Sequence, residues 1–163
     1  MKKLLCLLCA LLLLLSACSA PVDEGNWKLY FPSLSYLDGA ALEWESHNFE
    51  QEPTPDDLFS LLLSGPTDSG LFSPFPEGVF LRSWSVENGI LQLNLSEQYG
   101  GLSGIRLTLA DYSIVLTLCQ LSGIEGVTIS VANDPMPFRY RQTMTPDDIL
   151  LDSRTTPAGT MTE

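Results

Sequence analysis

The chain has 163 residues, 45% of them hydrophobic, with eight basic and twenty acidic side chains and a formal net charge of −12. A chain of this length can bury the core of one globular domain, and we expect a single one. Its acidic surface repels phosphate polymers and anionic lipid headgroups, which excludes a nucleic-acid-binding protein.

The N-terminus is predicted to be a cleaved signal peptide. Lys2 and Lys3 precede an apolar run from Leu4 to Leu15. This run of about twelve residues is shorter than the roughly twenty residues of a membrane-spanning helix. It ends in Leu-Ser-Ala-Cys at 15–18, which resembles a bacterial lipobox. The resemblance implies cleavage before Cys18, a diacylglycerol thioether on its sulfur and a lipid anchor at the extracytoplasmic face of the cell membrane; the alternative is an ordinary secretory signal that happens to contain Cys18.

Cleavage would change the net charge and the cysteine content of the remaining chain. Loss of Lys2 and Lys3 leaves six basic residues against twenty acidic ones, a net charge of about −14. Apart from Cys18, Cys119 is then the only cysteine, so no intramolecular disulfide is possible. We predict a signal peptide over 1–17, the lipidated cysteine and a tether over 18–26, a domain over 27–151 and a flexible tail over 152–163.

The first half of the domain is predicted to contain a hairpin and a helix. Residues 27–34 and 42–50 alternate as strands do, with a turn at Asp38-Gly39. In the second strand the alternation places Trp44 on the core face and His47 opposite it. A helix is expected over 54–66, because Thr54 can cap it, acidic residues follow in its first turn, and Gly65-Pro66 ends it.

The second half begins with another predicted hairpin, over 79–97. Asn88-Gly89 is the preferred pair for a tight hairpin turn, and three leucines on the return strand face the core: Leu91, Leu93 and Leu95. A flexible glycine-rich loop is expected over 98–106. A mostly buried helix then runs to Gly123, with Thr108 as its cap and Asp111 as the capping-box partner. The last core strand is expected over 126–133, and a short turn of helix at 145–148.

Three of these segments resemble the GerMN domain, also called the sporulation and spore germination domain. They are "TPDDLFSLLLSGP", "FPEGVFLRSWSVENGILQLNLSE" and "IVLTLCQLSGIEGVTISVAND", and the match covers about residues 27–140. The resemblance implies an α+β fold like that of the ring-building motif: a two-layer sandwich of a mixed or antiparallel sheet with two helices packed on one face. It also implies an envelope lipoprotein, mainly of Gram-positive bacteria, with no assigned catalytic residues. The familiar sporulation members carry two such domains and this chain one, which leaves sporulation, germination and vegetative cell-wall maintenance open as roles.

The residues that could carry catalysis are better explained by structural roles. Cys119 lies deep in an apolar helix, far from the helix N-terminus or the cation that would activate a thiol. His47 is the only histidine and has no partners for a zinc site. Two of the clustered carboxylates could in principle serve glycoside hydrolysis or bind calcium weakly, but such acids are expected on a solvated strand face and a helix N-terminus; they are Glu43, Glu45, Glu50, Glu52, Asp56 and Asp57. We predict no catalytic residue, no metal and no cofactor.

Aromatic and arginine side chains are the candidate binding residues, because Trp, Tyr and Arg dominate protein interfaces. The set is Tyr36, Trp44, Trp84, Arg82, Arg139 and Tyr140. The alternative is that Trp44 and Trp84 only close the core. The sequence thus favours a membrane-anchored, non-enzymatic lipoprotein that binds an envelope protein or itself. A second hypothesis is a lipoprotein that binds cell-wall glycan or peptide and assists a wall hydrolase.

Overall fold

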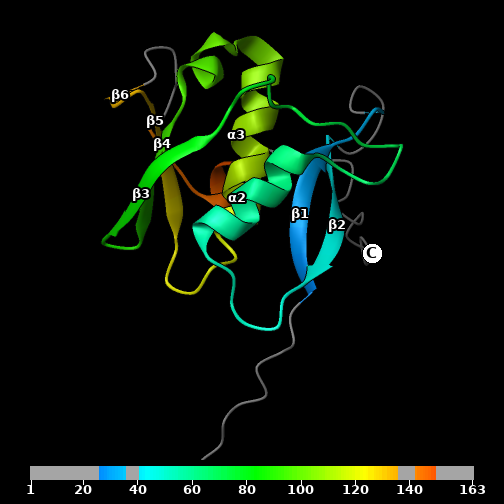
Figure 1. The fold of residues 1–163 in the computed structure, drawn as a ribbon, viewed down its shortest axis with the longest axis horizontal. Helices are drawn as coiled ribbons and strands as arrows, with labels where there is room; N and C mark the ends of the chain where they lie inside the picture. Colours follow the sequence, from blue (N-terminus) through cyan, green and yellow to red (C-terminus); the bar gives the residue numbers. More distant parts are fainter. Residues whose placement is uncertain (1–25, 36–40, 136–141, 150–163) are drawn as a thin grey trace, which may run out of the picture.

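The computed structural model describes residues 26–35, 41–135 and 142–149, which form two β-sheets with helices between them (Figure 1). The smaller sheet pairs β1 with β2, and the larger has the order β3-β4-β5-β6, with β7 also paired to β5. The elements are β1 (Asn26–Pro32), β2 (Leu42–Asn48), α2 (Pro55–Ser64), β3 (Leu81–Glu87), β4 (Ile90–Leu95), the 3-10 helix η1 (Glu97–Gly101), α3 (Gly104–Leu118), β5 (Gly126–Val131), β6 (Asp134–Pro135), β7 (Thr143–Met144) and the 3-10 helix η2 (Pro146–Asp148).

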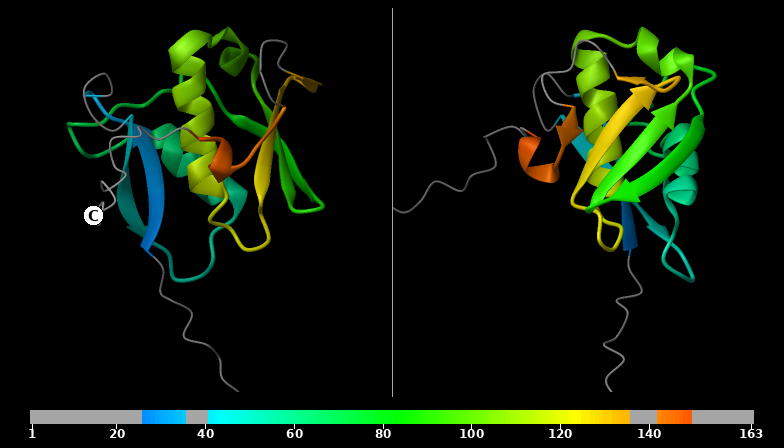
Figure 2. Two further views of the ribbon diagram at one scale, coloured as in Figure 1. Left: turned by 180° about the vertical axis from the view of Figure 1, so that it is seen from behind. Right: turned by 90° about the vertical axis from the view of Figure 1, so that its left-hand side faces the viewer.

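The larger sheet is mixed and carries the helices on one face. β3 and β4 are antiparallel, whereas β4 and β5 are parallel and are joined by the crossover through α3. Leu91, Leu93 and Leu95 are buried on the face toward the helices, as predicted. The views in Figure 2 show α2 and α3 between this sheet and the β1–β2 hairpin. The α+β prediction with two helices on one face is confirmed, and the hairpin forms a separate sheet on the far side of the helices.

Local signals place α2 where the sequence predicted it. Thr54 caps the helix, and its backbone N–H donates to the Asp57 carboxylate at 2.8 Å, which completes a capping box. Leu58, Phe59 and Leu62 form the buried face. Gly65 follows the helix with a φ of 80°, a conformation that favours glycine.

The β1–β2 hairpin is joined to α3 by hydrogen bonds along the free edge of β1. The Lys28 backbone N–H donates to the Gln120 side chain at 3.0 Å, and that of Tyr30 donates to the Thr117 hydroxyl at 3.1 Å. Leu29 and Phe31 of β1 are buried against the helices. Side chains of α3 therefore cover the β1 edge that β2 leaves free.

The predicted orientation of β2 is wrong. Glu45 and His47 lie opposite Leu29 and Trp27, on the same face of the hairpin as the core residues of β1, whereas Trp44 lies opposite Tyr30 on the outer face. The acidic face can point inward because β2 is the outer strand, and most of its side chains remain exposed. Glu45 uses this position to accept hydrogen bonds from the backbone N–H groups of Thr67 and Asp68.

The glycine-rich segment is ordered, and α3 begins earlier than predicted. Residues 97–101 form η1, whose Tyr99 is fully buried and donates its hydroxyl to the Asp111 carboxylate at 2.6 Å. The helix starts at Gly104, so Thr108 lies inside it. The Thr108 hydroxyl donates a hydrogen bond to the Gly104 carbonyl oxygen. Asp111 is thus a buried acceptor and not a capping residue. The buried Tyr99 ring and its hydrogen bond to Asp111 attach the glycine-rich segment to the core.

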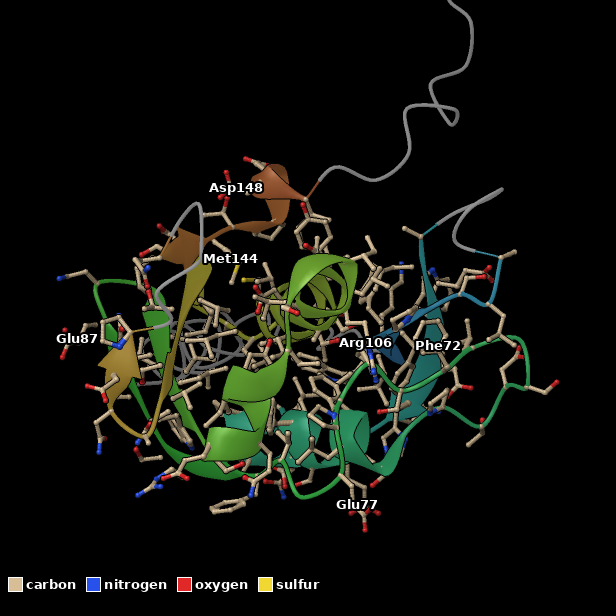
Figure 3. The ribbon with its side chains drawn as sticks, turned by 90° about the horizontal axis from the view of Figure 1, so that it is seen from above. Phe72, Glu77, Glu87, Arg106, Met144 and Asp148 are labelled. Atoms are coloured by element: carbon tan, nitrogen blue, oxygen red, sulfur yellow. The ribbon has the colours of Figure 1, made fainter. Side chains whose placement is uncertain are left out.

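The end of the described chain follows the prediction in outline. β5 ends at Val131, and the chain turns at Ala132 and Asn133, which both have positive φ. The short helix predicted at 145–148 is present as η2. Figure 3 shows Met144 of β7 beside α3, consistent with its burial in the core.

Several predictions fall outside the described residues. They concern the signal peptide, Cys18 and its tether, the Asp38-Gly39 turn, Tyr36, Arg139, Tyr140 and the tail. Within the described ranges, no helix has both the length and the apolar character needed to cross a membrane.

Candidate interaction surface

Cys119 has the environment of a structural thiol. It is the C-cap residue of α3, it is half-buried, and it packs against the hydrophobic core. Loss of hydration raises the pKa of its thiol to about 11. A nucleophilic cysteine needs the opposite shift, from a cation or a helix N-terminus, to hold its thiolate at neutral pH.

We expect Cys119 to react slowly with iodoacetamide at pH 8 in the folded protein. Because the thiolate is the reacting species, the rate should rise about tenfold per pH unit until the pH approaches 11. Rates measured in a chain that starts at residue 19 isolate this thiol. Urea-unfolded protein is the control, since an unperturbed thiol with a pKa of about 8.5 reacts faster. Fast alkylation of the folded chain at pH 7 would contradict the structural assignment.

The structure places His47 at the surface of the β1–β2 hairpin. Its ring lies 4.8 Å from that of Phe49. Among the described residues, no three His, Cys, Asp or Glu side chains are grouped so that they could hold a metal ion.

Three of the clustered carboxylates make separate structural contacts. Glu45 holds the loop after α2, and Asp57 belongs to the capping box, whose hydrogen bond from the Thr54 backbone lowers the pKa of the Asp57 carboxyl. Glu52 accepts from the Ser122 backbone N–H at 2.8 Å, which lowers the pKa of the Glu52 carboxyl in the same way. A glycoside hydrolase needs two carboxylates that face one substrate across a site. These side chains instead serve different loops and helix ends.

Trp44 forms one exposed aromatic surface, on the outer face of the β1–β2 hairpin. Its side chain is 49% exposed, it lies opposite Tyr30, and the Lys28 ammonium lies 4.5 Å from the centre of its ring. That distance is within the range of a cation–π contact. Trp44 therefore does not close the core.

The second exposed surface lies along β3, which is the terminal strand of the larger sheet. Every residue from Arg82 to Glu87 is exposed. Trp84 and Val86 lie opposite Leu93 and Leu91, and thus on the face of the sheet that carries the helices. Both side chains remain exposed, because the helices do not cover this end of the sheet. The Trp84 indole N–H donates to the Asp56 carboxylate at the start of α2, which fixes the ring.

The tertiary structure separates the predicted interaction residues. Trp84 and Arg82 share β3, whereas Trp44 lies on β2, on the other side of the helices (Figures 1 and 2). Sequence reasoning did not select Val86 or Phe80, although both are large, apolar and about half-exposed. The alternation around Asn88-Gly89 places Val86 on a strand, but no local signal shows that this strand ends the sheet.

Comparisons with known proteins agree on one family of domains. A family model described as "Germane: Sporulation and spore germination" matches residues 28–137. The first GerMN domain of the sporulation protein GerM from Bacillus subtilis superposes with a TM-score of 0.63 at 14% identity, over 76% of this chain and 99% of that one. A structure of the tandem GerMN domains of GerM gives a TM-score of 0.54 at 19% identity, over 72% of this chain and 43% of the other. At these identities the structures share the fold alone. No curated protein sequence matches the chain significantly.

Proposed function

Because the chain belongs to the Germane family of sporulation and spore germination domains, we propose that it is a non-catalytic interaction module of the bacterial cell envelope. It is held at the extracytoplasmic face of the membrane through an acylated Cys18, and it binds an envelope protein or a second copy of itself. The observation that supports this proposal best is the exposed apolar pair Trp84 and Val86 on the terminal strand β3 of a strongly acidic domain. An exposed apolar edge strand promotes aggregation in an isolated protein, whereas in a protein that binds partners it can serve as the binding site.

The chemistry of the described residues favours binding over catalysis. The thiol of Cys119 is protonated at neutral pH, since burial raises its pKa to about 11. Glu45, Glu52 and Asp57 are each engaged by a different backbone segment. These four side chains thus have structural rather than catalytic surroundings.

A second candidate function is binding of cell-wall glycan or peptide in support of a wall hydrolase. It is favoured by the outer face of the hairpin, where Trp44, Tyr30 and Lys28 combine aromatic rings with a cation. Aromatic side chains offer large contact area together with a polar group.

An in-cell crosslink tests the two functions against each other. The lipidated protein is crosslinked in the cells that express it, purified and examined by mass spectrometry for bound proteins and for muropeptides. We expect one or two envelope proteins, or a second copy of the chain, in a stable ratio. Recovery of glycan or muropeptide alone would favour the second function and contradict the first.

A further inference from the structure

We propose that the free edge of β3 binds an extended, cationic segment of a partner polypeptide, which adds to the larger sheet as a new strand. The proposal rests on the function proposed above and names both the surface and the chemistry of the partner. In this mode of recognition, main-chain hydrogen bonds supply affinity and alternating side chains supply specificity.

β3 is an edge strand that the described part of the chain leaves open. Only β4 pairs with it in the described ranges, and the strand is exposed from Arg82 onward. Natural edge strands are usually protected by charged side chains, proline, a β-bulge or a covering loop. The β3 sequence LRSWSVE contains no proline, and its two charged residues, Arg82 and Glu87, lie at the register shift and at the end of the strand, so that Ser83 to Val86 carry no charge. Its one irregularity is a shift of register between Leu81 and Ser83, which leaves the strand regular from Ser83 to Glu87.

The turn geometry shows which backbone groups of β3 are free. Asn88 and Gly89 have φ values of 51° and 78°, as in a two-residue type I′ turn. The residues that flank such a turn, Glu87 and Ile90, form a hydrogen-bonded pair, and bonded and non-bonded pairs then alternate along the ladder. Trp84 and Val86 therefore belong to non-bonded pairs. Their N–H and C=O groups point away from β4, toward an added strand.

The same two residues supply the apolar contacts for such a strand. Trp84 is 39% and Val86 46% exposed, and both project from one face of β3. The hydrogen bond from the indole to Asp56 orients the Trp84 ring before any partner arrives. Less side-chain freedom is then lost on binding.

The negative charge around β3 favours a cationic partner segment. Asp56 lies beside Trp84 on one face of the strand, and Glu87 lies at its end, where Figure 3 shows it at the margin of the molecule. Lys28, Arg82 and Arg106 are the only lysines and arginines in the described ranges, and acidic residues outnumber them severalfold. A lysine or arginine on the added strand would pair with these carboxylates and approach the Trp84 ring. A second copy of the chain brings the same negative charge and is disfavoured.

The test uses two peptide probes on the lipidated, signal-cleaved chain in zwitterionic detergent. One fluorescent peptide alternates lysine with threonine, and the other has glutamate in place of each lysine. Binding is followed by fluorescence anisotropy at low salt. We expect the lysine probe to bind at least about tenfold more tightly, and this preference to shrink as salt screens the charges.

A pair of substitutions at one residue separates the edge from the rest of the surface. Val86→Pro removes an outward-facing N–H but no bond to β4, which an edge strand tolerates. We expect it to weaken lysine-probe binding about tenfold or more, whereas Val86→Thr, which keeps the N–H and the branched side chain, should change it less than about twofold. Asp56→Asn keeps an acceptor for Trp84 but removes a charge, and it should weaken the lysine probe selectively. Circular dichroism and thermal unfolding of each variant confirm the fold.

Results that would overturn the proposal are distinct from failure of the proposed function. Equal binding of the two probes, or binding that survives Val86→Pro, would remove the edge of β3 as the site. In cells, a photo-crosslinker at Ser85 should join a lysine- or arginine-rich segment of another protein; a joined second copy of this chain would contradict the proposal. If Val86→Pro leaves the envelope partners of the previous section unchanged, the edge proposal falls and the interaction function stands. If the unmutated protein captures no protein at all, the interaction function falls.

Discussion

Replacement of Cys18 by alanine is expected to move nearly all of the protein from the membrane fraction to the soluble fraction. The proposed thioether would require the Cys18 sulfur, and each buried methylene of its acyl chains would contribute about 0.8 kcal/mol to membrane attachment. The protein surface cannot substitute for the lipid, because a chain with a net charge of −12 is repelled by anionic headgroups. Cell fractionation and immunoblotting measure the distribution.

Cys9→Ala is the matched control for this prediction. It changes a cysteine within the apolar run of the signal and leaves the lipobox at 15–18 intact. We expect it to fractionate with the membrane as the unmutated protein does. Retention of Cys18→Ala in the membrane fraction would show that the lipobox interpretation is wrong.

Phe59→Ala is expected to lower the free energy of unfolding by about 3–5 kcal/mol, the usual cost of truncating a buried phenylalanine. Phe59 is 1% exposed on the inner face of α2, and its ring meets that of Phe75 edge-on at a centroid distance of 5.9 Å. The Phe75 ring in turn lies 6.4 Å from that of Tyr99, so the substitution opens a cavity next to the segment that leads into α3. Urea denaturation followed by circular dichroism gives the change.

Phe80→Ala is the comparison that isolates burial from residue type. Phe80 is 54% exposed, and we expect its truncation to change the free energy of unfolding by no more than about 0.5 kcal/mol. A loss of this size for Phe59→Ala as well would mean that α2 is not packed as described. The loss expected for Phe59→Ala is a large fraction of the stability of a small domain, about 5–15 kcal/mol, so this variant is also expected to accumulate poorly in cells.

The predictions that succeeded rest on interactions between residues close in sequence. The capping box of Thr54 and Asp57 links positions three residues apart, and it fixes the start of α2. Asn88-Gly89 sets the turn of the β3–β4 hairpin by the positive φ that both residues adopt. The alternation of Leu91, Leu93 and Leu95 needs only the period of a strand to define a core face.

The predictions that failed depended on contacts distant in sequence. The glycine-rich segment is ordered because Tyr99 is buried and donates to Asp111, twelve residues later. The inward orientation of Glu45 is possible because the backbone at Thr67 and Asp68 binds its carboxylate, 22 and 23 residues away. No periodicity within a strand or loop encodes such partners.

The candidate site shows the same division. Sequence composition selected Trp84 and Arg82 as binding residues, and the structure places both on one exposed strand. It also selected Trp44, which the fold puts on the other sheet, on the far side of the helices. Val86 became a candidate only when β3 proved to be the edge of its sheet.

By itself the sequence determined the family resemblance, the acidic charge, α2 and the β3–β4 hairpin, because each follows from residue type or from contacts within a few positions. Only the tertiary structure decided that β4 pairs in parallel with β5 and that the β1–β2 hairpin forms its own sheet. It also decided that β3 has no neighbour on one side among the residues that the structure describes. Strand order and exposure depend on which elements compete for the same core and for the same backbone hydrogen bonds. Strand order and exposure are therefore fixed by contacts between segments distant in sequence, which form only when the whole domain folds.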